Sequence, residues 1–243
     1  MQSHKLSFDN GRGKSLNARL DLPDDREAEA FALFAHCFTC TMNLKAIANI
    51  NRALTDAGIA VLRFDFADTN FTSNAQDLVA ASGFLKREYQ APRILIGHSL
   101  GGAAVIQAAS EIPSSRAVVT IGAPCEPNHV EKLLGDPDMI KRDGETEINL
   151  AGRVFRITSQ FIEDLEKSRM TDRIRKLKRA ILILHSPIDN IVGIENAAHI
   201  FHSARHPKSF VSLDTADHLP MNERDSVYAG RVIAVWAGRY LRN

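Results

Sequence analysis

Cysteine is scarce in this sequence, with three residues in 243, and a small odd number argues against a disulfide framework. Long apolar runs are also missing. None exceeds the length of a strand, so no membrane span is expected. The first residues, Met1 to Ser7, lack the apolar core of a signal peptide. These absences predict a cytoplasmic protein without a membrane partner.

An excess of charge of either sign is lacking as well. Lys and Arg number 30 against 29 Asp and Glu, a net charge of +1, so neither nucleic acid nor another polyanion is implied as a partner. The apolar fraction of 44% and the charged fraction of 24% are those of an ordinary soluble globular protein. The length fits one α/β domain with a small insertion, or at most two small domains.

Two of the cysteines, Cys37 and Cys40, form a C-x-x-C motif. A zinc site would need a second pair of ligands at a suitable spacing, and the sequence offers none. A redox dithiol would open a helix in a thioredoxin-like context, which does not fit a chain of this length. We therefore interpret the motif as two small residues in a loop after a strand, and we expect no metal.

Apolar runs of strand length alternate with helical patterns along most of the chain. Continuous apolar runs are typical of strands covered on both faces, and strands are predicted at 31–35, 59–66, 93–96, 117–124, 180–184 and 208–213. Amphipathic patterns predict helices near 43–57, 74–89, 100–111, 194–204 and 226–240. The alternation predicts a parallel, doubly wound sheet. A period-two pattern over 5–22 predicts an antiparallel hairpin at one edge.

The alternation stops at residues 126–178, which are charged and contain no buried strand. Residues 148–157 are typical of a hairpin, and residues 159–170 of an amphipathic helix. We therefore expect a core domain of residues 1–125 and 179–243, with residues 126–178 as a small cap insertion over the site. A surface excursion with no role in substrate choice is the alternative.

The sequence Gly97-His98-Ser99-Leu100-Gly101-Gly102 has the Gly-x-Ser-x-Gly pattern of a nucleophile elbow. An apolar strand precedes it and a run of small residues follows, which is the context that the motif requires. A serine on such a strained turn needs neighbours without bulky side chains. A nucleotide-binding turn is the alternative, but no Lys-Ser or Lys-Thr pair follows the glycines.

A serine hydroxyl is a weak nucleophile and needs a base, usually a histidine held by a buried carboxylate. Asp189 and His218 follow Ser99 in the chain order Ser, Asp, His, and each comes after a predicted parallel strand. These three residues are the predicted catalytic triad. Asp214 or Asp217 could take the place of Asp189.

The remaining histidines are not expected to act as the catalytic base. By the alternation of the strand, His98 points away from the hydroxyl of Ser99. His36 and His185 end strands, where they can brace loops. Those at 199, 202 and 206 lie on or after a helix and are expected in solvent.

An oxyanion hole needs two backbone N–H donors. Leu100, the residue after the nucleophile, is expected to supply one, and the loop after the first buried strand the other. Within that loop we expect Phe38, with Thr39 as the second choice. Phe38, Leu100, Met221 and Met170 are candidates for the wall of the substrate pocket, and each can equally belong to the core.

The motifs at 97–102, 185–189 (His-Ser-Pro-Ile-Asp) and 216–219 (Ala-Asp-His-Leu) together resemble the α/β-hydrolase fold family. More narrowly, the stretches 35–40, 61–66 and 69–74 are similar to the hydrolase part of bacterial proteins that fuse such a domain to an osmotically inducible protein C-like domain. This sequence contains no such second domain. The resemblance implies a hydrolase of small esters, with short acyl groups and no cofactor.

The expected function is that of a carboxylesterase acting on a small-molecule ester through an acyl-enzyme. An amidase, peptidase, thioesterase or perhydrolase would use the same triad. A non-catalytic binding protein that retains the fold is the alternative from another class. The sequence does not determine the oligomeric state, so the question of whether the chain forms a homodimer is left open.

Overall fold

The structure, a computed structural model, describes all residues except 38–40, 69, 127–136, 151–152, 168 and 242–243. Among the described residues, eight strands form one sheet and two more form a separate hairpin. The main sheet has the order β1-β2-β4-β3-β5-β6-β9-β10. Its strands are β1 (Gln2–Asp9), β2 (Ser15–Leu22), β3 (Ala30–Ala35), β4 (Ile59–Phe64), β5 (Ile94–His98), β6 (Ala117–Ile121), β9 (Ala180–His185) and β10 (Lys208–Ser212).

Strand β2 pairs antiparallel with both β1 and β4, and every pair from β4 to β10 is parallel. The mostly parallel sheet with an antiparallel N-terminal hairpin is therefore confirmed. Because the parallel strands run in one direction, their carboxyl ends share one edge of the sheet, where sites of open α/β sheets form.

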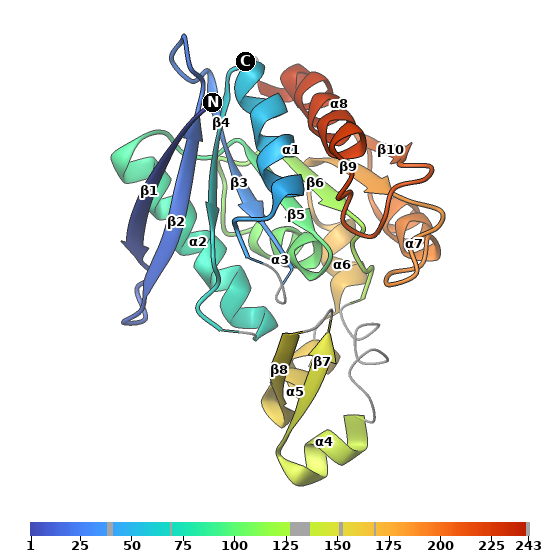
Figure 1. The fold of residues 1–243 in the computed structure, drawn as a ribbon. Helices are drawn as coiled ribbons and strands as arrows, with labels where there is room; N and C mark the ends of the chain where they lie inside the picture. The colour runs from blue at the N-terminus through green and yellow to red at the C-terminus, as the bar shows by residue number, and fades with distance from the viewer. Residues whose placement is uncertain (38–40, 69, 127–136, 151–152, 168, 242–243) are drawn as a thin grey trace.

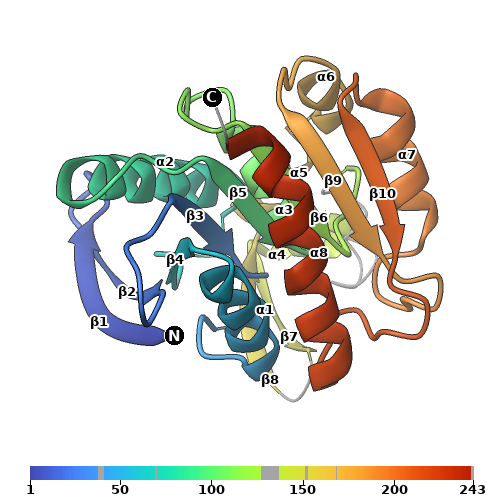
Figure 2. The same cartoon turned by 90° about the horizontal axis from the view of Figure 1, so that it is seen from above.

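Helices cover both faces of this sheet (Figure 2). One face carries α1 (Lys45–Asp56) and α8 (Glu223–Leu241), and the other carries α2 (Phe71–Glu88), α3 (Leu100–Ala108), α6 (Met170–Arg175) and α7 (Glu195–Ser203). Since successive strand residues face opposite sides, Leu33 joins the apolar layer of α2 and α3, and Phe34 joins that of α1 and α8. No helix among the described residues has the length and apolarity needed to cross a membrane.

A smaller unit lies beyond the carboxyl ends of the parallel strands (Figure 1). It consists of α4 (Pro137–Asp143), β7 (Glu145–Leu150), β8 (Arg153–Thr158) and α5 (Ser159–Lys167). The hairpin predicted at 148–157 is present and longer. The single helix predicted over 159–170 is instead two, because the carboxylate of Glu126 accepts from the N–H groups of Met170 and Thr171, at 3.0 and 2.9 Å, and so begins α6.

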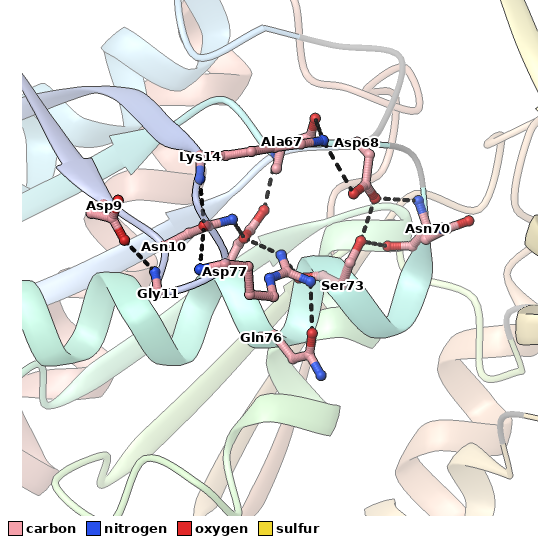
Figure 3. A network of polar contacts seen from close by, with 11 residues as sticks. Asp9, Asn10, Gly11, Lys14, Ala67, Asp68, Asn70, Ser73, Gln76 and Asp77 are labelled. Carbon is pink, nitrogen blue, oxygen red and sulfur yellow. Dashed lines mark hydrogen bonds and ion pairs between the residues drawn. The ribbon is translucent and has the colours of Figure 1, made fainter.

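A polar cluster fastens the β1–β2 hairpin to the segment that leads into α2 (Figure 3). At its centre the fully buried carboxylate of Asp77 accepts from Asn10 Nδ2 and from Ala67 N, both at 2.9 Å, and pairs with Arg12. Asp68 accepts from the amide of Asn70, also at 2.9 Å. The antiparallel edge of the sheet is thus tied to the helix that follows β4.

Candidate active site

Ser99 occupies a strained turn between β5 and α3. Its backbone angles, φ 54° and ψ −127°, lie in a region that residues with side chains rarely adopt. Ser99 N donates to Ile121 O at 2.9 Å, and Ser99 O accepts from Gly102 N at 2.8 Å. Strain of this kind costs about 1–3 kcal/mol and persists only where the surrounding structure enforces it.

Glycine is required around this turn because backbone segments touch there. A Cβ atom on Gly97 would lie 2.2 Å from Gly101 O, and one on Gly101 would lie 2.4 Å from Ala35 O. Contacts this short with backbone oxygen atoms cannot be relieved by a side-chain rotation. The second of them brings the start of α3 against the end of β3, which leads into the loop of the predicted oxyanion donor.

Asp189 and His218 form a hydrogen-bonded pair. His218 Nδ1 lies 2.7 Å from Asp189 Oδ2, so the neutral ring carries its proton on Nδ1 and keeps Nε2 as an acceptor. Asp189 Oδ1 accepts from the amides of Ile191 and Val192, both at 2.9 Å. Burial opposes ionisation, but the hydrogen bonds from His185 and His218 and the amide of Val192 outweigh it and hold the pKa of Asp189 well below its usual range.

Two further residues support this pair. His185, fully buried at the end of β9, has its Nε2 2.7 Å from Val192 O and 3.5 Å from Asp189 Oδ2, which confirms its expected bracing role. Gly122, with φ 54°, lies so close that a Cβ atom there would be 3.2 Å from Asp189 Oδ2 and 3.3 Å from His218 Nδ1. Gly122 was not predicted as a site residue, although a glycine directly after a buried strand is a signal for a close backbone approach.

His98 links the serine turn to His218, 120 positions further along the chain. Its Nε2 lies 3.0 Å from His218 O, and the centroids of the two rings are 4.8 Å apart. Burial, together with repulsion from His218 when that ring is protonated, lowers the pKa of His98 to about 3. A neutral His98 therefore fixes the main chain of His218 beside the turn that holds Ser99.

Leu100 is the first residue of α3. The amide of a first helical residue has no carbonyl partner inside its own helix and can bind a ligand instead. The second donor was predicted from Phe38 or Thr39, and both lie outside the described residues.

The end of β3 is held by His36 and Cys37. His36 Nδ1 lies 2.7 Å from Cys37 O, and its Nε2 lies 3.1 Å from Asp65 Oδ1, so His36 braces this loop as expected. Burial opposes ionisation of Asp65, but the hydrogen bonds from His36 and from the amide of Met42 lower its pKa. Cys37 is disulfide-bonded, which corrects its interpretation as merely a small loop residue.

The predicted pocket residues lie in different surroundings. Leu100 is buried at the start of α3, whereas Met221 is 49% exposed. Met170 is fully buried in the apolar layer that it shares with α3, so the structure places it in the core, the alternative that the sequence left open. Phe38 is not among the described residues.

In the part of the chain that the structure describes, no group of three or more His, Cys, Asp or Glu side chains could hold a metal ion.

Cys125 is a buried free thiol whose pKa is raised to about 11 by burial and by the charge of Glu126. It therefore stays protonated, which makes it a poor nucleophile. The histidines at 199, 202 and 206 are exposed, as expected.

Comparison with known proteins points to one family and one fold. Residues 32–169 match the model of the alpha/beta hydrolase family. The esterase domain of a Rhodothermus marinus protein is 52% identical, with 100% of each chain covered and a TM-score of 0.85. Est1E from Butyrivibrio proteoclasticus is 20% identical over 98% of each chain, with a TM-score of 0.83, and shares the fold. No match was found among curated proteins.

Proposed function

The chain belongs to the alpha/beta hydrolase family, and from this premise we infer that it is a serine esterase of small carboxylic esters. The strained backbone of Ser99 carries the inference, because such a turn presents the hydroxyl above the end of β5 to a bound substrate. The full-length similarity to the Rhodothermus marinus esterase domain supports an ester as the substrate class. We also propose that the acyl groups are short, because the sequence motifs resemble those of hydrolases that act on small esters with short acyl groups.

In the proposed first half-reaction, Ser99 Oγ attacks the ester carbonyl carbon while His218 Nε2 takes the hydroxyl proton. The oxyanion of the tetrahedral intermediate accepts hydrogen bonds from Leu100 N–H and from Phe38 N–H. As the intermediate collapses, the bond from carbon to the alcohol oxygen breaks, and His218 returns the proton to that oxygen. The products are acylated Ser99 and a free alcohol.

In the second half-reaction, water attacks the acyl carbon and gives a proton to His218 Nε2, which then passes it to Ser99 Oγ as the acid departs. Each transfer makes His218 transiently cationic. The carboxylate of Asp189, 2.7 Å from Nδ1, stabilises that cation. Its low pKa keeps Asp189 ionised at every pH at which such an enzyme works. These steps use no cofactor.

We also propose that residues 126–178 act as a cap that limits which esters reach Ser99. The smaller unit lies at the edge of the sheet where the triad residues follow their strands (Figure 1). Asp164 of α5 contacts the first turn of α2, since its carboxylate accepts from Thr72 N at 2.7 Å and from the Thr72 hydroxyl. Phe161 and Ile162 of α5 are fully buried and extend the main core into this unit.

Labelling with a fluorophosphonate, followed by mass spectrometry of the intact protein, tests the nucleophile. We expect one adduct on the wild type, none on Ser99→Ala, and one on the matched control Ser110→Ala, which changes an exposed serine just after α3. Ester hydrolysis by Ser99→Ala should fall by about 10⁴- to 10⁶-fold with the fold unchanged.

An adduct on folded Ser99→Ala, or undiminished turnover by it, would refute the assignment. A panel of esters, thioesters and anilides graded by acyl length then tests the substrate class. An esterase should show the highest kcat/KM on the esters, and a preference for the anilides would favour the amidase alternative.

A further inference from the structure

A cavity of about 540 Å³ lies at the amino ends of three neighbouring strands. Arg116 directly precedes β6, Arg179 precedes β9, and Pro207 precedes β10. The proposed triad follows the carboxyl ends of the strands, so the cavity lies at the opposite edge of the sheet, where α8 also ends (Figure 1). Its lining consists of Arg116, Lys178, Arg179, Ala180, His206, Pro207, Arg239 and Tyr240.

Four positively charged side chains converge on this cavity, and its lining contains no Asp or Glu. Among the residues with described positions, none of these four forms an ion pair. Three other cavities also contain Arg or Lys, but each of them has at least one carboxylate in its lining. Arg116, Lys178 and Arg239 are exposed, so solvent screens their mutual repulsion, and an anion bound among them would supply the counter-charge that the lining lacks.

A favourable interaction with a helix dipole explains only one of the four cations. Arg239 lies in the last turn of α8, where the negative end of the helix favours a cation. Arg116, Lys178 and Arg179 lie outside helices. Lys178 also has a φ of 51°, a positive value that non-glycine residues adopt at some cost.

The guanidinium group of Arg179 is already oriented. Its Nε donates to Ser115 Oγ at 3.2 Å and its Nη1 donates to Lys178 O at 3.0 Å. Ser115 is itself fully buried and bonded to Ile112 O at 2.7 Å. These contacts hold the group by two of its nitrogen atoms and leave Nη2 available. A guanidinium fixed in this way is well suited to phosphate oxygens.

We propose that this cavity binds a small molecule that carries two or more phosphate groups. Two phosphate groups bear about three to four negative charges near neutral pH, which matches the four cations. The volume of about 540 Å³ is that of a small-molecule site. Because the net charge of the chain is only +1, the attraction is local and does not extend to polyanions in general. The proposal is independent of the esterase activity.

The single tryptophan of the chain lies next to this cavity. The ring centroid of Trp236 is 4.8 Å from that of Tyr240, which belongs to the lining. Trp236 also donates from Nε1 to Ser209 Oγ of β10 at 3.0 Å. A ligand that contacts Tyr240 therefore changes the surroundings of Trp236, and its fluorescence reports binding without any assay of turnover.

Inorganic pyrophosphate is the probe for the test. Titration of the full chain at about 0.15 M salt, by calorimetry and by Trp236 fluorescence, should show one site with a Kd below about 100 μM. Orthophosphate should bind at least about tenfold more weakly, because it makes fewer charge-assisted hydrogen bonds. Sulfate added at equal ionic strength corrects for screening.

The double variant Arg116→Gln/Arg179→Gln should weaken pyrophosphate binding by at least about tenfold. The matched control Arg224→Gln/Arg231→Gln makes the same charge change at two exposed arginines nearer the start of α8 and should keep the wild-type affinity. Since Arg179 also contacts Ser115, the exposed Lys178→Gln provides a second test that spares this contact, with an expected loss of about threefold or more. Absence of binding, equal binding of orthophosphate, or equal losses in both double variants would overturn the proposal.

Discussion

His98 is buried beside the proposed base and yet carries no charge. Burial, together with repulsion from His218 when that ring is protonated, lowers its pKa to about 3. Its Nε2 faces the main-chain oxygen of His218, and its Nδ1 has no hydrogen-bond partner among the described residues. A second proton would therefore create an unpaired buried charge next to His218, so the neutral ring is the form that can hold the base in place.

Stability measured against pH should reveal this residue. His98 titrates near 6.5 when exposed and near 3 in the folded protein, so the unfolded chain binds more protons between those values. The free energy of unfolding is then highest above pH 6.5 and falls on acidification, by up to about 1.4 kcal/mol per pH unit from this group. Urea denaturation between pH 7 and pH 5 measures the slope.

The variant His98→Gln should show a shallower slope than the wild type. The control His4→Gln changes a histidine that is exposed on β1 and should keep the wild-type slope. If all three proteins lose stability at the same rate on acidification, His98 is not the group responsible.

Single residues differ in how far their roles could be predicted. Ser99, Asp189 and His218 could be singled out because each sits in a motif directly after a strand. The contacts of His98 with His218 and the close approach of Gly122 could not, since both arise from packing between segments far apart in the chain. The disulfide at Cys37 was not predicted either, because the spacing of cysteines in the sequence does not show whether a thiol is bonded or reduced.

Helices α1 and α8 approach each other through a glycine. A Cβ atom on Gly230 would lie 2.7 Å from Ile50 O and 2.8 Å from Ala53 Cβ. Ile50 is fully buried, so the backbone of α1 cannot withdraw without disturbing the core. Gly238 lies further along α8, and a Cβ atom there would meet nothing within 4 Å.

These two glycines give a matched pair of variants. Gly230→Ala should lower the free energy of unfolding by about 1–3 kcal/mol, because the added methyl group overpacks the contact between the helices. Gly238→Ala should raise it by about 0.5–1 kcal/mol through helix propensity alone. Urea denaturation at neutral pH compares both with the wild type, and a stabilising Gly230→Ala would show that α1 and α8 are not packed as described.

The elements of the main sheet were predictable because buried parallel strands and amphipathic helices have strong local patterns. Helix boundaries that depend on contacts between distant parts of the chain were not predictable. Helix α2 begins at Phe71 rather than near residue 74, since Phe71 packs fully buried in the core. The break between α5 and α6 depends on Glu126, which lies more than 40 residues before Met170 in the chain. No local pattern could reveal either contact.

A carboxylate connects the smaller unit to the rest of the molecule. Asp164 of α5 binds Thr72 in the first turn of α2. An anion at a helix start contributes about 0.5–2 kcal/mol, which is small against the stability of a whole domain. Loss of the Asp164 contact should therefore release the smaller unit locally without unfolding the sheet.

Hydrogen exchange followed by mass spectrometry tests this expectation. Asp164→Ala should raise exchange across residues 137–167 by about two- to tenfold, with the exchange of β3, β5 and β6 unchanged. Glu147→Ala removes an exposed carboxylate of β7 and serves as the control, with no change expected. Exchange in Asp164→Ala that matches the wild type would exclude this contact as a restraint.

The residues of the proposed triad lie on both sides of residues 126–178 in the sequence. Ser99 precedes residues 126–178, whereas Asp189 and His218 follow them, and the two parts meet where β6 pairs with β9. A chain opened within that segment would give two polypeptides, neither of which contains a nucleophile together with its base. Fused to two proteins that associate, these halves would reconstitute ester hydrolysis only on association, so the fold lends itself to a split-enzyme sensor.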